Sequence, residues 1–78
     1  MLRIDHLPEG TQLRLARIAV GLTLFDVGRL ADVSPPRLSE FERGRPSLSP
    51  EAVARVWALL ADASAPTARR VERVIASV

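Results

Sequence analysis

Apolar residues recur along this chain at the three- and four-residue spacing that is typical of short amphipathic helices. The first helix is predicted from Thr11 to Val20, and Gly21 follows it as a C-cap. The second helix starts after Thr23, which can cap it together with Asp26 in a variant of the capping box. The first half of the chain therefore predicts two consecutive helices joined by a short loop.

Three further helices are predicted after a sharp turn. Asp32 stands at that turn and tolerates the left-handed backbone better than most residues. A third helix is predicted at residues 36–43, between Ser34 and a glycine. Residues 49–51, Ser-Pro-Glu, are a strong helix start with an N-cap serine, a proline at N1 and an acid in the first turn. Residues 62–67 end this fourth helix, and the proline within them opens a fifth.

The pattern as a whole predicts an all-α fold of five short helices in one domain. We divide it into an N-terminal arm at 1–10, a central domain at 11–61 and a C-terminal helix at 62–78. The first seven residues fit either a short strand or an arm. The fifth helix either closes the core or forms a dimer contact, through apolar positions at helical spacing: Val71, Val74, Ile75 and Val78.

Composition narrows the classes of function. Hydrophobic residues make up 47% of the chain but aromatic residues only 4%, so the core must be built from Leu, Val, Ala and Ile. Cysteine is absent, which excludes disulfides and thiolate metal sites. All 11 basic residues are arginine and the net charge is +2, which permits nucleic-acid binding without requiring it. The positions of the arginines therefore matter more than their number.

Neither a signal peptide nor a membrane span is predicted. The first ten residues contain no apolar run, and no stretch approaches the roughly 18 apolar residues that cross a bilayer. We expect a soluble, cytoplasmic protein without a membrane partner.

A spaced pattern of residues extends over positions 13–45, LRLARIAVGLTLFDVGRLADVSPPRLSEFERGR. It comprises L-R-x-x-R-x-x-x-G-L-T, an apolar-small pair at 27–28, V-S at 33–34 and F-E-R-G-R at 41–45. With the fourth helix, PSLSPEAVARVWALL, this pattern resembles the lambda-repressor-like (Xre/Cro-type) helix-turn-helix family over residues 10–61. The resemblance implies that the second and third helices form a helix-turn-helix.

Three expectations concern packing. Gly28 stands inside the second helix where the family usually has Ala, and glycine there costs about 0.5–1 kcal/mol relative to alanine, so we expect a close contact between helices. The resemblance implies that Arg17 and Glu42 form a largely buried ion pair, although two solvated surface charges are the alternative. Phe41 and Trp57 are expected in the core, at apolar positions of the third and fourth helices.

The resemblance also implies that the third helix lies in the major groove of DNA and the second crosses above it. Arg43 and Arg45 then contact the phosphate backbone, and Arg37 reaches either a phosphate or guanine. Glu40 can accept from cytosine N4 and can also pair with Arg37. The candidate DNA-binding residues are Thr23, Pro36, Arg37, Ser39, Glu40, Arg43 and Arg45, with Arg14 and Arg29 as outer contacts.

The chain departs from the family pattern at the places that normally read or clamp DNA. Leu24 replaces a glutamine that commonly bonds a phosphate, and Pro35 and Pro36 occupy two reader positions. Proline is tolerated in a first helical turn, where its missing N–H has no intrahelical partner. Because a residue that precedes proline favours an extended backbone, we expect the third helix to begin at Pro36.

Catalysis and metal binding receive no support from the sequence. His6 is the only histidine and has no cysteine with which to form a metal site. The serines stand at predicted helix caps, and a short helical chain offers little room for a catalytic cleft. We expect no enzyme activity, no cofactor and no small-molecule ligand.

Two functional hypotheses follow. The leading one is a small DNA-binding regulator of transcription, of repressor type, that associates with the nucleoid as a homodimer on double-stranded DNA. The alternative is a helix-turn-helix domain that has become a protein-interaction module for a toxin, a polymerase subunit or another regulator. Its support is the pair of prolines, Glu40, and the adjacent apolar residues Leu24 and Phe25 where a DNA-facing surface is normally polar.

Overall fold

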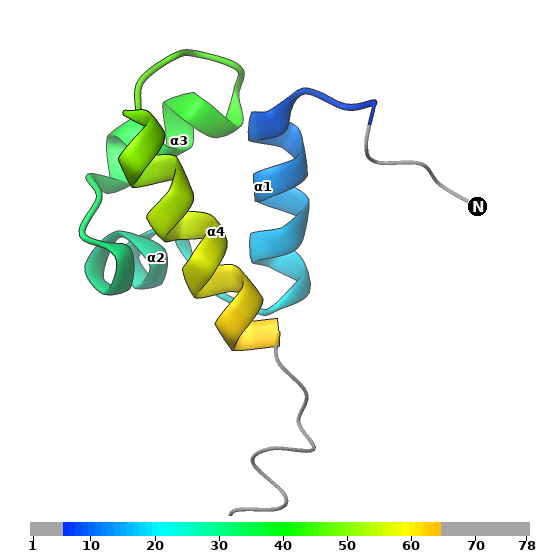
Figure 1. Ribbon diagram of the computed structural model, residues 1–78, viewed down its shortest axis with the longest axis vertical. Helices are drawn as coiled ribbons and strands as arrows, with labels where there is room; N and C mark the ends of the chain where they lie inside the picture. The colour runs from blue at the N-terminus through cyan, green and yellow to red at the C-terminus, as the bar shows by residue number, and fades with distance from the viewer. Residues whose placement is uncertain (1–5, 65–78) are drawn as a thin grey trace, which may run out of the picture.

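Four helices account for all the regular structure in residues 6–64, the part of the chain that the computed structural model describes. These are α1 (Glu9–Ala19), α2 (Leu24–Ala31), α3 (Pro35–Glu42) and α4 (Pro50–Ser64) (Figure 1). No strand occurs in this range. The predicted fifth helix, with Val71, Val74, Ile75 and Val78, lies outside the described residues, as do residues 1–5.

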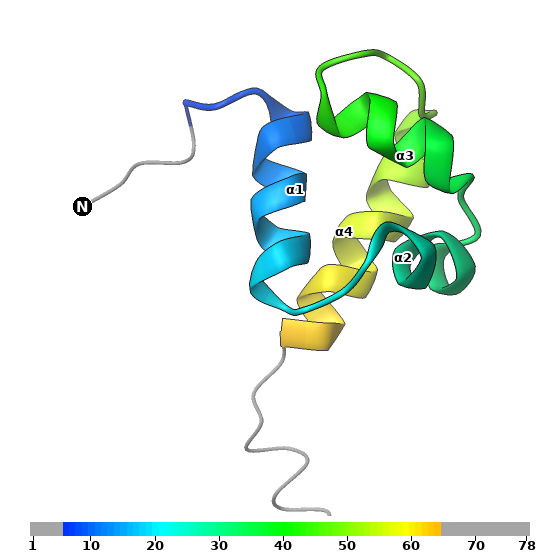
Figure 2. The same ribbon diagram turned by 180° about the vertical axis from the view of Figure 1, so that it is seen from behind.

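The four helices share one core. α1 packs against α3 and α4, and α2 packs against the same two helices (Figure 2). Each helix contributes one large and fully buried side chain: Leu13, Val27, Leu38 and Val56. The core is aliphatic, as the composition predicts. None of the helices described is long and apolar enough to cross a membrane.

A capping box at the start of α2 and a left-handed residue at its end define the helix and the turn that leads to α3. The Thr23 hydroxyl accepts from the Asp26 backbone N–H at 3.0 Å, and the Asp26 carboxylate accepts from the Thr23 N–H at 2.9 Å, which completes the predicted capping box. At the other end, Asp32 adopts φ 55°, the left-handed backbone expected at this turn. Residues 32–34 alone therefore join α2 to α3.

The bounds of three helices differ from those predicted. α3 begins at Pro35 and not at Pro36, so both prolines lie in its first turn, where neither removes a helical hydrogen bond. α1 begins at Glu9, whose acidic side chain suits a first turn. α4 continues to Ser64 instead of ending before Asp62, because the alanines of this segment are strong helix formers.

Gly28 is close to the first turn of α3. A Cβ atom built on Gly28 would lie 2.8 Å from Pro35 Cγ and 2.8 Å from the Val33 carbonyl oxygen. The close contact expected at this position is therefore present, and its partners are a proline ring and the backbone of the turn. Gly28 and Pro35 fit each other: the ring takes up the space that an alanine methyl group would need.

A second glycine allows α1 to approach α3. A Cβ atom on Gly10 would collide with the carbonyl oxygen of Phe41 near the end of α3. The sequence did not indicate this contact, because the two residues are far apart in the chain.

Arg55 of α4 braces the turn between α2 and α3. Its Nε donates to the Ala31 carbonyl at 2.9 Å, and its Nη2 donates to the Asp32 carbonyl at 3.2 Å. These carbonyls belong to the end of α2, where intrahelical partners are missing. α4 thereby fixes the angle between the two helices that follow each other at the turn.

Candidate nucleic-acid interface

α3 has an inner side that holds the fold and an outer side that faces solvent. Leu38 and Glu42 are buried, and Phe41 packs half-buried against the core. Pro36 and Arg37 lie exposed on the other side. The predicted site residues are therefore divided between two environments on a single short helix.

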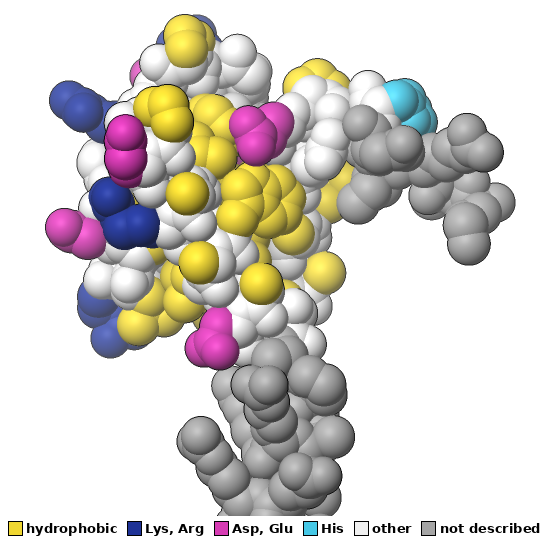
Figure 3. Space-filling view, viewed as in Figure 1, with side chains coloured by type: hydrophobic (Ala, Val, Ile, Leu, Met, Phe, Trp, Pro, Cys, Tyr) yellow, Lys and Arg dark blue, Asp and Glu magenta, His cyan; other side chains and the backbone are white. Residues whose placement is uncertain are grey.

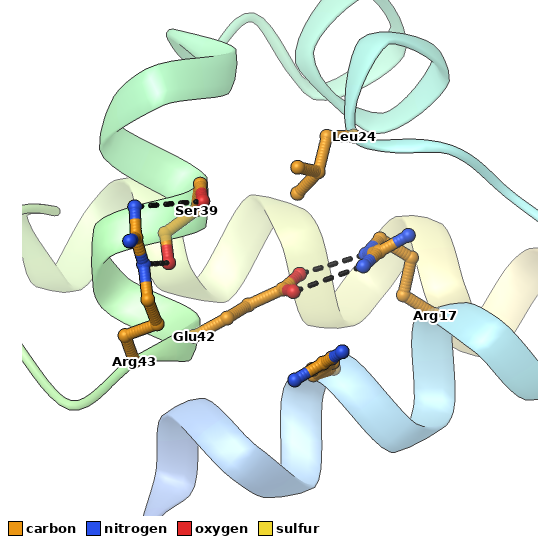
Figure 4. Close-up of a pocket in the computed structure, with 6 residues that line it drawn as sticks. Arg17, Leu24, Ser39, Glu42 and Arg43 are labelled. Carbon is orange, nitrogen blue, oxygen red and sulfur yellow. Dashed lines mark hydrogen bonds and ion pairs between the residues drawn. The ribbon is translucent and has the colours of Figure 1, made fainter.

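Arg17 and Glu42 form a bidentate ion pair between α1 and α3 (Figure 4). Arg17 Nε lies 2.7 Å from Glu42 Oε2, and Nη2 lies 3.0 Å from Oε1. The side chains are 11% and 4% exposed, and Arg17 Nη1 also donates to the Leu22 carbonyl at 2.9 Å. In this geometry the two charges satisfy each other inside the protein, so Glu42 does not oppose DNA.

Arg43 folds back along α3 and has no carboxylate partner among the described residues. Its Nη2 donates to Ser39 Oγ at 3.2 Å and its Nε lies 3.4 Å from the Ser39 carbonyl (Figure 4). The hydrogen bonds to Ser39 orient the guanidinium group without neutralising its charge. Ser39 is thus engaged in holding Arg43.

A cavity of about 310 Å³ opens between α1, α3 and the start of α2. Glu42 is the single acid in its lining and is already paired with Arg17, whereas Arg14 and Arg43 form no ion pair within residues 6–64. The cavity therefore has two uncompensated positive charges. Leu24 supplies an apolar wall to this cavity. An anion with several acceptor oxygens fits these charges.

Glu40 pairs with Arg45 from the loop that follows α3. Arg45 Nη1 lies 3.5 Å from Glu40 Oε1, and the side chains are 70% and 44% exposed respectively. The i,i+3 pair between Arg37 and Glu40 that the sequence allowed is not formed. The reason is the loop: Gly44 adopts φ 95°, and the Arg45 N–H donates to the Glu40 carbonyl at 3.0 Å, which places Arg45 beside Glu40.

Arg37 projects from α3 with its side chain exposed and without an ion pair among the described residues. Its carbonyl accepts a hydrogen bond of 2.6 Å from Ser47 Oγ, which ties the following loop to the middle of the helix. Pro36 is also exposed and offers only apolar contact. Arg37 is thus the cation on α3 that no neighbouring side chain restrains.

The start of α2 carries an anionic cap. The hydrogen bond from the Thr23 backbone N–H, with smaller effects from the Thr23 hydroxyl and Arg29, holds the pKa of Asp26 below its ordinary value. Arg29 Nη2 lies 3.9 Å from Asp26 Oδ1, a weak and exposed pair. Thr23 is exposed, but its hydroxyl, its N–H and its carbonyl are all engaged in hydrogen bonds at the start of α2.

Trp57 lies partly buried at the edge of the core instead of within it. Its Nε1 donates to Glu9 Oε2 at 3.1 Å, which joins α4 to the first turn of α1. The position is explained by the indole N–H, which would have no partner in the aliphatic interior. Sequence spacing did not indicate this partner.

Apolar side chains are exposed where α1 ends and α2 begins. Phe25 is 76% exposed and Ile18 is 54% exposed, beside a shallow hollow of about 560 Å³ that Leu22 and Leu24 also line. Leu24 turns toward the core and toward the cavity beside α3, so Phe25 is the prominent residue of this patch.

No cluster of three or more potential metal ligands occurs within residues 6–64. His6 is exposed at the start of this range. Every buried polar side-chain atom within this range has a hydrogen-bond partner.

Comparison with known proteins gives one match. A family model described as a helix-turn-helix domain matches residues 10–71, which is most of the chain. No curated protein matches the chain, and no solved structure does so. The matched range begins at the second residue of α1 and extends beyond the end of α4, so it includes both sides of α3.

Proposed function

We propose that this chain, which belongs to the helix-turn-helix domain family, binds double-stranded DNA as a small regulator of transcription, with the outer side of α3 in the major groove. The observation that supports this most is the set of arginines without carboxylate partners around α3: Arg14, Arg37 and Arg43. Their charges are not used by the fold, and a polyanion would compensate them.

The cavity between α1 and α3 is the proposed phosphate site. Arg43 lies along α3, held by Ser39, and Arg14 stands across from it on α1. A phosphate between them would receive two charge-assisted contacts, which replace the glutamine clamp that Leu24 cannot supply. Because Ser39 orients Arg43 before DNA arrives, little side-chain entropy is lost on binding.

Base recognition is proposed to rest on Arg37 and Glu40. Arg37 can donate two hydrogen bonds to guanine O6 and N7, and Glu40 can accept from cytosine N4. Glu40 repels phosphates, but its pair with Arg45 reduces that repulsion. Pro36 can contact a thymine methyl group. This set favours G·C pairs near the middle of each half-site.

Two copies on adjacent half-sites complete the proposal. One helix of eight residues reads only a few base pairs, so useful specificity requires two half-sites about one helical turn apart. Such a dimer on a promoter blocks polymerase, which is repression. Binding to chromosomal DNA would also place the protein at the nucleoid.

The direct test is fluorescence anisotropy with labelled DNA from the region upstream of the protein's own gene, over a salt series. The proposal predicts that the logarithm of the affinity falls linearly with the logarithm of salt, with a slope of about −0.9 per phosphate contacted. An unrelated duplex of equal length is the control and should bind more weakly. Absence of binding at low salt would overturn the proposal.

A second candidate function is supported by the Phe25–Ile18 patch. An exposed phenylalanine at the start of α2 suits docking of another protein, such as a toxin, a polymerase subunit or a second regulator. The two candidates separate by substitution. Phe25→Ser should leave DNA affinity unchanged if the patch serves a protein partner alone, whereas Arg43→Ala should weaken DNA binding and leave partner binding intact.

A further inference from the structure

An apolar groove runs between α1 and α4. It consists of two hollows that share Trp57, one of about 370 Å³ and the other of about 490 Å³. The first is lined by Ala16, Val20, Leu60, Ala61 and Ser64. The second is lined by Phe41, Leu48, Val53 and one acid, Glu9 of α1, whose carboxylate accepts from the Trp57 N–H. We call the two together the α1–α4 groove. Figure 3 shows apolar side chains gathered along this face.

The groove lies apart from the proposed DNA-binding side. α4 lies in front of α3 in Figure 1 and behind it in Figure 2. Neither hollow is lined by Arg37, Arg43 or Arg45. In the first hollow, Ser64 is the single polar residue, and Trp57 is left half-buried. An exposed apolar surface of this size is usually buried by another apolar segment, and a strongly charged ligand would not bury it.

We propose that residues 66–78 of the same chain fill the α1–α4 groove through their stripe of Val71, Val74, Ile75 and Val78. The place where the described chain ends supports this occupant. Ser64 itself lines the groove, so the following residues start at its end. The stripe matches the groove in polarity, and it has helical spacing after a proline that suits a helix start.

The lengths also agree. A helix over residues 66–78 would be ~20 Å long, and α4, with 15 residues, is ~22 Å long. A helix antiparallel to α4 that starts beside Ser64 would bring Val74 and Ile75 about level with Trp57, and Val78 about level with Val53. The stripe would then extend over both hollows.

The covalent connection to α4 favours occupation of the groove by this segment of the same chain over the same segment of a second copy. A segment joined to Ser64 by a short linker has an effective concentration on the order of millimolar, which exceeds the concentration at which a free second copy competes. The stripe thus closes the core of its own chain. Pairing of two copies on DNA would then use other surfaces.

Trp57 reports directly on the groove, because the chain contains one tryptophan and no tyrosine. We suggest comparing the full-length chain with Ile75→Asp, and using Ala76→Asp as the matched control, since residue 76 lies off the stripe. Ile75→Asp should shift Trp57 emission to longer wavelength and raise acrylamide quenching several-fold, with far-UV circular dichroism showing that α1 to α4 remain folded. Ala76→Asp should leave both unchanged. Equal behaviour of the two variants would overturn the proposal.

Disulfide trapping shows whether the segment in the groove belongs to the same chain or to a second copy. The chain contains no cysteine, so introduced cysteines have no competitors. Ala61→Cys combined with Val71→Cys should form a disulfide within one chain under mild oxidation, seen as a monomer by non-reducing electrophoresis and mass spectrometry. The control pair, Ala58→Cys with Val71→Cys, should react much more slowly, because Ala58 does not line the groove. Predominant disulfides between chains, or equal rates for the two pairs, would overturn docking within one chain.

Discussion

The inner and outer sides of α3 each carry an ion pair, and the two pairs have different environments. Glu42 and Arg17 are joined by two short hydrogen bonds and are almost wholly buried. Glu40 and Arg45 are 3.5 Å apart, and their side chains are 44% and 70% exposed respectively. Successive helix residues are about 100° apart, so these two glutamates point to opposite sides of one helix. Identical side chains two positions apart can therefore serve the fold in one case and a ligand in the other.

The largest effect is expected on the inner side. Glu42→Ala should lower the free energy of unfolding by about 3–5 kcal/mol, because Arg17 would remain buried without its partner. A domain of this size has a total of roughly 4–12 kcal/mol, so much of its stability would be lost. Urea denaturation followed by circular dichroism measures the change. A loss below about 1 kcal/mol would show that the pair behaves as a surface pair.

A double variant is the control for this prediction. Replacing both partners by apolar residues, Arg17→Met with Glu42→Leu, leaves no buried charge unpaired. Its stability should lie well above that of Glu42→Ala. If the double variant is as unstable as the sum of the two single changes, the pair is not the source of the effect.

The next largest effect on stability is expected where Gly28 packs against Pro35. Gly28→Ala should destabilise the protein by about 1–3 kcal/mol, because the new methyl group would overlap the proline ring and the Val33 carbonyl. Adding Pro35→Ala should recover part of the loss, since it removes one of the two obstacles. Thermal and urea unfolding of the unchanged protein, the single variant and the double variant measure this recovery. Equal stability of Gly28→Ala and the unchanged protein would contradict the contact.

On the outer side, Arg43→Ala should change the free energy of unfolding by no more than about 0.5 kcal/mol. It should weaken binding to all DNA sequences. It should also make the slope of the logarithm of affinity against the logarithm of salt concentration less steep by about 0.9. Arg43→Lys is the matched control, because it retains the charge and should retain the slope. Anisotropy over a salt series gives both values, and an unchanged slope for Arg43→Ala would exclude a phosphate contact.

Glu40→Gln isolates the second ion pair. We expect a change in stability of no more than about 1 kcal/mol, because both partners are exposed. The variant should bind DNA more tightly at low salt and discriminate less between cytosine and other bases at one position. Binding to a set of duplexes with single substitutions measures this. An unchanged preference would remove Glu40 from the reading set.

The smallest effect is expected at Asp26. Its side chain is accessible to solvent like that of Glu40, but it stabilises the fold, as Glu42 does, by capping α2. Its hydrogen bonds lower its pKa in the folded state, so it stabilises the fold at pH above its ordinary pKa. That contribution should disappear as pH falls through the lowered value. Unfolding curves of the protein and of Asp26→Asn between neutral and acid pH should therefore converge at low pH. A constant difference across the range would contradict the cap.

The sequence predicted the features that depend on neighbouring residues. The capping box at Thr23 and the left-handed turn at Asp32 follow from short-range chemistry. The close contact at Gly28 was expected because glycine in a helix needs a reason, although the pattern did not identify Pro35 as its partner. Local rules thus located the turn between the second and third helices and the residues that shape it.

Contacts between distant residues were not predictable in this way. Arg55 reaches the carbonyls at the end of α2 from 24 residues away, and Trp57 reaches Glu9 from 48 residues away. No spacing rule joins such positions, because their distance depends on how the helices pack. The same applies to the site: Glu40 meets Arg45 because a glycine turn directs the loop, not because of helical spacing.

The most direct test of the division between the two sides is a titration of the isotopically labelled, full-length chain with its specific duplex, followed by nuclear magnetic resonance. We expect the largest shifts at Arg14, at Thr23 and over residues 36–45, while Phe25 and the α1–α4 groove change little. Large shifts at Phe25 or in the groove with α3 unchanged would contradict this expectation. Absence of any shift at low salt would contradict it equally.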